Sequence, residues 1–151
     1  MHLAYVRHIG PYAGDEALFE RLFTKLITWA APRGLFRPPD TEMLSIYHDN
    51  PDLTDADKLR TDICITVPPD TQVDGEIGKS LIPEGKYAVA RFEIDASEYG
   101  EAWDIVYGEW LPESGFQPGE GAPCFELYRG DPKEHPEGKH TFDLCLPVQP
   151  L

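Results

Sequence analysis

Hydrophobic positions follow two kinds of period along the chain, and their order predicts the fold. Residues 2–9 alternate apolar and polar side chains as a strand does, and residues 15–34 carry apolar side chains at the spacing of an amphipathic helix. Short runs at 43–48 and 61–67, rich in β-branched and aromatic residues, predict two more strands. The first half therefore has the order β-α-β-β.

The second half repeats this order. The same two periods predict a strand at 86–94, a helix at 97–115, and strands at 124–129 and 141–148. On the predicted helix, one apolar stripe holds Tyr99, Trp103, Val106 and Trp110. The stretch between the halves is rich in Pro, Gly and Asp, which is typical of a connector.

Identical residues recur at one fixed offset, which indicates a duplicated unit. The pairs that lie 81 positions apart are Trp29 and Trp110, Gly34 and Gly115, Tyr47 and Tyr128, Pro51 and Pro132, Asp62 and Asp143, Cys64 and Cys145, and Val67 and Val148. Self-similarity at a fixed period is the signature of a repeated supersecondary unit. We expect repeats at 1–68 and 85–149, joined by a connector at 69–84, within a single domain.

The predicted class is α+β. Two β-α-β-β modules would form a six-stranded, mostly antiparallel sheet, with two helices on one face and pseudo-twofold symmetry. At 151 residues the chain is long enough for one domain with a substantial core.

An acidic residue interrupts the strand predicted at 124–129. Alternation places Phe125 and Leu127 on one face, and Glu126 on the other face with Cys124 and Tyr128. One interpretation is a solvent-facing carboxylate, which a half-exposed antiparallel sheet permits. The other is a carboxylate recessed among aromatic side chains in a cleft between the two repeats.

The second interpretation predicts a ligand class. The aromatic side chains expected around Glu126 are Tyr47, Trp103, Tyr107, Trp110 and Tyr128. Removing a carboxylate from water is costly, so a cation that restores a partner for it is favoured, and aromatic faces add cation–π attraction. Such a cleft would bind lipophilic or aromatic cations with broad specificity.

The net charge limits the classes of binding partner, and the cysteine content indicates the compartment. The formal net charge of −14 repels phosphate backbones and acidic lipid surfaces, so we expect no direct nucleic-acid or membrane binding. The odd count of three cysteines, without a CxxC pair, favours a reducing compartment, and no apolar run is long enough to span a membrane. We therefore expect a cytoplasmic location.

Motifs for catalysis, metal binding and cofactor binding are missing. The acidic residues of the loop at 49–57 lack the order of a calcium loop, and the five histidines show no zinc-site spacing. No phosphate-binding glycine loop or Ser/His/Asp order is present. We predict no cofactor and no metal, and we assign no catalytic residue.

Several blocks together resemble the GyrI-like small-molecule-binding family. The blocks are VRHIGPY (6–12), HDNPDLTDADKLRTDICITVP (48–68), EGKYAVARF (84–92), WLPESGF (110–116) and PCFELYRGDP (123–132). The family includes the gyrase inhibitory protein SbmC and the effector-binding domains of AraC-type and MerR-type multidrug regulators. The resemblance implies paired SHS2-type modules and a glutamate that contacts cationic ligands, which by position is Glu126.

The resemblance also implies alternatives to cation binding. An acidic SbmC-like protein would inhibit DNA gyrase by protein–protein contact, and some GyrI-like proteins are hydrolases, for which Glu126 would serve as general acid or base. The chain holds no helix-turn-helix segment, so it is expected to be a free-standing protein or the effector domain of a larger regulator. Its expected partners are cationic amphipathic compounds, and a DNA-binding regulator domain or DNA gyrase.

Overall fold

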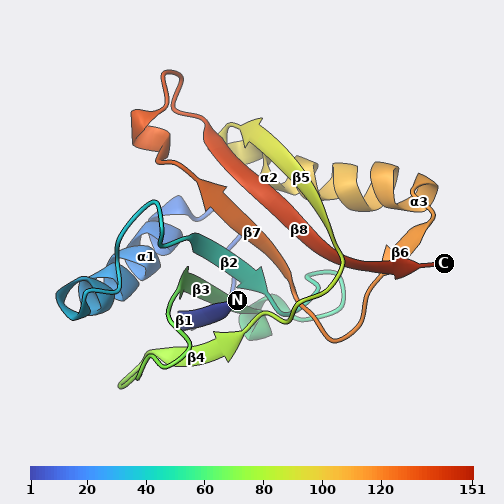
Figure 1. The fold of residues 1–151 in the computed structure, drawn as a ribbon. Coiled ribbons are helices and arrows are strands. Elements are labelled where there is room, and N and C mark those ends of the chain that lie inside the picture. Colours follow the sequence, from blue (N-terminus) through green and yellow to red (C-terminus); the bar gives the residue numbers. More distant parts are fainter. The chain divides into compact units, whose positions relative to one another are not determined.

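The computed structural model describes residues 1–151 as two compact units (Figure 1). The first unit is Met1–Glu84 and the second is Gly85–Leu151. Residues 69–84, expected to be a connector, belong to the first unit. None of the helices is both long and apolar enough to cross a membrane.

The first unit is an antiparallel sheet with one long helix. Its strands pair in the order β4-β1-β3-β2. The elements are β1 (His2–Ile9), α1 (Glu16–Ala30), η1 (Ala31–Arg33), β2 (Met43–Tyr47), η2 (Ala56–Lys58), β3 (Arg60–Thr66) and β4 (Gly78–Leu81).

Local sequence signals set both ends of α1. At its start the Asp15 side chain accepts a hydrogen bond from the Leu18 amide at 3.0 Å, which satisfies one of the free backbone donors of the first turn. After the short η1 turn, Gly34 adopts the left-handed conformation, with φ of 71°, and ends the helical stretch. Leu26 and Ala30 are fully buried, so one face of the helix covers the sheet as the apolar spacing predicts.

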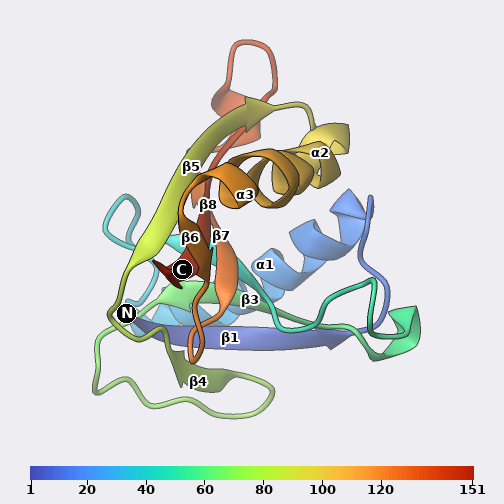
Figure 2. The same cartoon turned by 90° about the vertical axis from the view of Figure 1, so that its right-hand side faces the viewer.

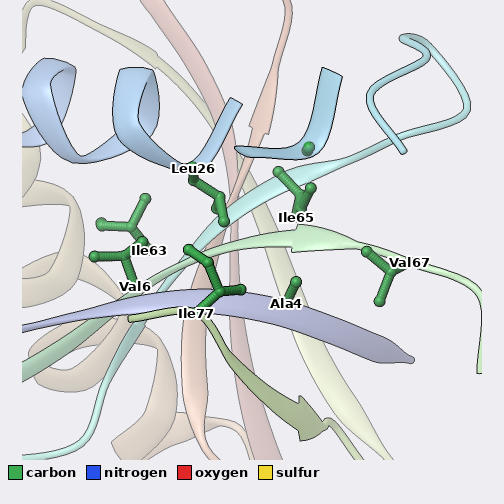
Figure 3. Packing of buried hydrophobic residues seen from close by; sticks show 8 residues of the cluster. Ala4, Val6, Leu26, Ile63, Ile65, Val67 and Ile77 are labelled. Atoms are coloured by element: carbon green, nitrogen blue, oxygen red, sulfur yellow. The ribbon is translucent and has the colours of Figure 1, made fainter. Parts of the chain in front are cut away.

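The core of the first unit joins α1 to its sheet. Figure 3 shows the buried side chains of this cluster, which include Ala4, Val6, Leu26, Ile63, Ile65, Val67 and Ile77. Ile77 comes directly before β4, so the segment between the two predicted repeats contributes to this core.

A buried carboxylate ties β1 to β3 on the other side of this unit. Asp62 is paired in register with Arg7, whose guanidinium donates to both carboxylate oxygens at 2.7 and 2.9 Å. His48 Nε2 contacts the same carboxylate at 2.7 Å. Burial raises the pKa of Asp62, but the hydrogen bonds from Arg7 and His48 outweigh it and hold that pKa below its usual value. Asp62 is thus kept as a charged crosslink.

The second unit has the same succession of strand, helix and strands. Its strands pair antiparallel in the order β7-β8-β5, and a short β6 pairs with the end of β8 (Figure 2). The elements are β5 (Tyr87–Ile94), η3 (Ala96–Glu98), α2 (Tyr99–Asp104), η4 (Ile105–Trp110), α3 (Leu111–Glu113), β6 (Phe116–Pro118), β7 (Cys124–Arg129), η5 (Pro132–Glu134) and β8 (His140–Pro150).

The corresponding carboxylate of this unit is Asp143 on β8. Arg91 donates to its two oxygens at 2.8 and 3.2 Å, and Arg129 donates to one of them at 3.0 Å. The hydrogen bond from Arg91 holds the pKa of Asp143 below its usual value; burial opposes this effect and Arg129 reinforces it. Asp62 and Asp143, which lie 81 residues apart, therefore crosslink matching pairs of strands.

A capping box starts the second helical stretch. The Asp95 side chain accepts from the backbone of the third residue, and the Glu98 side chain accepts from the Asp95 amide at 2.8 Å. From there α2, η4 and α3 follow one another without a break. The middle element, η4, is a π-helix, in which the Leu111 amide bonds to the Val106 carbonyl five residues earlier.

The π-helix corrects the predicted apolar stripe. Residues Ala102, Val106 and Leu111 are buried in the core of this unit, whereas Trp110 is 42% exposed. An α-helical step of four from Val106 leads to Trp110, and the π step of five leads to Leu111. The prediction that Trp110 lies on the buried stripe is therefore wrong, because one extra residue in the turn rotates it toward solvent.

The predicted α+β class and antiparallel pairing are confirmed, but the strand count was too low. The units hold eight strands, and the two that the pattern missed are β4 and β6, with four and three residues. The pairings β1-β3-β2 and β5-β8-β7 are alike in the two units. Pseudo-twofold symmetry and an SHS2-type duplication stay predictions.

A close approach of backbone and ring holds β4 in place. Tyr5 is paired in register with Gly78, and its ring lies where a side chain at position 78 would stand. The same ring stacks under the Arg7 guanidinium at 5.2 Å. Only glycine leaves room for this arrangement.

We therefore expect Gly78→Ala to lower the free energy of unfolding by about 1–3 kcal/mol, because the new methyl group overlaps the Tyr5 ring. Urea denaturation measures the effect. The matched control is Gly100→Ala in α2, where nothing lies within 4 Å of the new group. That change should raise stability by about 0.5–1 kcal/mol through helix propensity. Wild-type stability for Gly78→Ala would contradict the predicted overlap.

Candidate functional site

Glu126 is a buried carboxylate in the middle of β7. It lies between Phe125 and Leu127, is paired with Leu144 of β8, and is only 2% exposed. The solvent-facing interpretation of this residue is therefore wrong. A charged side chain in such a position needs hydrogen-bond donors from its surroundings.

Two aromatic side chains supply donors to Glu126. The Trp103 indole Nε1 donates to Oε2 at 2.6 Å, and the Tyr128 hydroxyl donates to Oε1 at 2.9 Å. Tyr128 is two residues further along the same strand, so alternation places it on the same face. Trp103 comes from α2 and ties the helix to β7.

A second aromatic ring extends this group along the helix. Tyr107 stacks on Trp103 with ring centroids 5.8 Å apart and an interplanar angle of 19°, as four-residue spacing on a helix allows. The Tyr107 hydroxyl lies 3.0 Å from Cys124 Sγ. A continuous chain of contacts thus runs from Cys124 through the two rings to Glu126 and Tyr128.

Tyr107 and Cys124, at one end of this chain of contacts, stay neutral. Burial raises the pKa of Tyr107 above its usual value, and the contact with Cys124 adds to the effect. Burial also raises the pKa of the Cys124 thiol, although the Tyr107 hydrogen bond opposes it. A protonated thiol is a poor nucleophile, so Cys124 is poorly suited to covalent catalysis. Tyr107 and Cys124 are better suited to line a binding site.

The other two predicted residues, Trp110 and Tyr47, have ring partners of their own. Trp110 stacks on Phe116, with centroids 6.5 Å apart, because the π turn directs it away from the Trp103 side of the helix. Tyr47 belongs to the other unit, where its ring lies 5.2 Å from that of Tyr12. Its part in a ligand site stays a prediction.

One member of the group carried only a weak sequence signal. Cys124 shares a face of the predicted strand with Glu126 and Tyr128, but only the structure shows its contact with Tyr107. No cluster of three or more His, Cys, Asp or Glu side chains is placed to hold a metal ion within residues 1–151.

Comparison with protein families identifies the chain. The model of the GyrI-like small molecule binding domain matches residues 1–149. The chain belongs to the GyrI-like family. The sequence resemblance to this family is thus confirmed over almost the whole length.

Curated relatives of this GyrI-like domain are named DNA gyrase inhibitor. The protein from Erwinia billingiae is 31% identical over 143 residues, which cover 93% of this chain and 86% of the relative. The protein from Yersinia enterocolitica is 35% identical over 118 residues, which cover 76% and 73%. The similarity therefore extends over most of both chains.

Solved structures share the fold at low sequence identity. The EcmrR C-terminal domain has a TM-score of 0.75 at 16% identity, with 99% of this chain and 92% of that chain covered. A hydrolase from Listeria innocua has a TM-score of 0.61, also at 16% identity, with 99% and 87% covered. At such identity the likeness establishes the fold alone.

The Trp103–Glu126 bond leads to a stability prediction. We expect Trp103→Phe to lower the free energy of unfolding by about 1–3 kcal/mol, because a buried carboxylate oxygen loses a donor. Trp110→Phe is the matched control on the same helical stretch. Trp110 is half-exposed, so its cost should stay below about 1 kcal/mol. Equal losses in urea denaturation would argue against a special role for the Glu126 bond.

Proposed function

We propose that this GyrI-like domain binds cationic, lipophilic aromatic small molecules at Glu126. The observation that carries the proposal is the buried carboxylate whose oxygens accept from two aromatic side chains. A family of small-molecule binding domains is the setting in which such a group is expected to receive a ligand.

The physical basis is a match of charge and surface. A positive ligand atom near Glu126 would form a charge-assisted contact, stronger than one between neutral groups. The faces of Trp103 and Tyr107 would accept a flat ring and would add about 0.5–2 kcal/mol of cation–π attraction for each favourable contact. Recognition by charge and flatness needs no unique donor pattern, so several unrelated cations would bind.

Access to the carboxylate requires a side chain to move. Glu126 is almost completely covered, and Trp103 holds Oε2 while Tyr128 holds Oε1. A cation that displaces the Trp103 indole would exchange a neutral donor for a charged one, while Tyr128 keeps its bond. We therefore propose that ligand entry breaks the Trp103–Glu126 hydrogen bond.

The proposed role is that of an effector sensor or a sequestering module linked to transcription regulation, in the cytoplasm. The fold occurs in the EcmrR C-terminal domain, and EcmrR has also been solved bound to DNA. With a net charge of −14, this domain would act on DNA through a partner.

Glu126→Gln should weaken the binding of rhodamine 6G by about 10- to 100-fold, since the ligand cation loses its charged partner. Isothermal titration calorimetry measures the affinity, for which we expect a micromolar dissociation constant in the wild type. Fluorescein, an anionic dye with a related flat ring system, should not bind.

The matched control is Glu109→Gln, which removes the same charge from an exposed residue of the helical stretch that carries Trp103. This variant should bind rhodamine 6G as the wild type does. Equal affinity in the wild type and in Glu126→Gln would contradict the proposal. A hydrolysed product in the titration mixture would instead assign the site to catalysis.

A second candidate function is inhibition of DNA gyrase by direct contact. The observation that favours it is the name of the relatives, which are 31 and 35% identical over most of their length. A strongly acidic surface would compete with DNA for a basic enzyme surface, and salt would screen this attraction.

The second candidate leads to the opposite mutational pattern. The purified domain should inhibit DNA supercoiling by gyrase, the inhibition should fall steeply as salt is raised, and Glu126→Gln should inhibit as well as the wild type. A supercoiling assay on plasmid DNA measures this. Absence of inhibition at low salt would reject this candidate.

A further inference from the structure

The strand β5 forms an edge of the second unit. It is eight residues long, pairs with β8 on one side, and stands last in the order of strands (Figure 2). Its equivalent in the first unit, β1, pairs with β3 on one side and with the short β4 on the other. The first unit thus covers an edge that the second unit leaves open.

The pairing with β8 fixes which backbone groups lie on the open edge. The Val148 amide donates to the Lys86 carbonyl, so in this register residues 86, 88, 90, 92 and 94 exchange hydrogen bonds with β8. The residues between them direct their N–H and C=O groups outward. Val89, Arg91 and Glu93 therefore present unused backbone donors and acceptors to solvent.

The side chains on this edge are exposed and of opposite charge. Val89 is 61% exposed, and the side chains of Arg91 and Glu93 are 63 and 55% exposed. Charged residues on an edge strand usually prevent pairing between molecules. Here Arg91 and Glu93 stand two residues apart. In one antiparallel register between two such strands opposite charges face each other, whereas in the neighbouring register like charges do.

We propose that β5 pairs antiparallel with β5 of a second copy of this chain. In the favoured register Arg91 of each copy stands opposite Glu93 of the other, and the twofold symmetry makes both pairs at once. These two positions direct their backbone groups outward, so each pair also exchanges main-chain hydrogen bonds.

The alternative register is unfavourable, and the apolar face of β5 favours the register with Arg91 opposite Glu93. A shift that centres the pairing on Arg91 places two arginines opposite each other, which is unfavourable. In the favoured register the centre is Phe92, whose ring stacks on Phe142 on the helix side of the sheet. Phe92 of one copy would face Phe92 of the other, flanked by Ala90 and Ile94, so apolar contacts form on this face.

Sedimentation velocity of the full chain over a range of concentrations tests this proposal. We expect the wild type to form a reversible dimer as its concentration rises from micromolar toward millimolar. Glu93→Pro should remain monomeric, because proline removes an outward N–H without touching the bonds to β8. Near-UV circular dichroism checks that this variant keeps its tertiary structure.

A charge exchange gives an independent test. Glu93→Lys and Arg91→Glu should each dimerise about tenfold or more weakly alone, because each creates like-charged pairs. A mixture of the two variants should form the mixed dimer with near wild-type affinity, since both pairs are again opposite in charge. Arg91→Glu also loses its bonds to Asp143, and Glu93→Lys loses its contact with His135, so the fold of both variants is checked in the same way.

Two outcomes would overturn the proposal. One is a wild type that stays monomeric at the highest concentration, which would leave this edge to a different partner. The other is a dimer that Glu93→Pro forms as well as the wild type, which would place the interface elsewhere. If Arg91→Glu does not fold, the comparison of wild type with Glu93→Pro decides alone.

Discussion

A buried carboxylate on a strand constrains where the helix of the second unit can lie. Glu126 lies where an apolar residue would ordinarily close the sheet, and its burial is tolerable only with donors close at hand. One donor, Tyr128, follows from the alternation of the strand, but the other, Trp103, must be brought from a helix. The position of that helix against β7 is therefore specified by a polar contact as well as by apolar packing.

The sequence predicted the carboxylate and most of its neighbours, but not the geometry of the helix. Trp103 and Tyr107, four residues apart, stack on one side of the helical stretch, since Trp103 precedes the π turn and Tyr107 lies near its start. Trp110 follows the extra residue and is rotated away from the apolar stripe. The apolar spacing alone did not reveal the change of hydrogen-bond step, which leaves Val106 and Leu111 as the buried residues on either side of it and is followed directly by Pro112, a residue without a backbone N–H.

The missed strands have a similar cause. The segments of β4 and β6 have four and three residues and include glycine or proline, so neither shows enough alternation to be distinguished from a loop. What makes β4 a strand is its partner: β1 offers an open edge, and Gly78 leaves room for the Tyr5 ring. The long strands were predictable because the alternation of apolar and polar residues in their own sequence indicates which face is buried. A short edge strand forms only because a neighbouring strand offers an open edge to pair with.

The acidic composition and the acidic site have separate physical consequences. The net charge of −14 acts over about a Debye length, attracts any basic partner and weakens with salt. Glu126 contributes one charge to that total, yet it is buried among aromatic rings and would act on a proposed ligand only at contact distance, where salt screens little. The two properties are thus independent in this fold, because one depends on the number of surface carboxylates and the other on a single buried one. In the proposed function, the acidic surface would serve one partner, while the residue at position 126 in β7 would decide which small molecules bind.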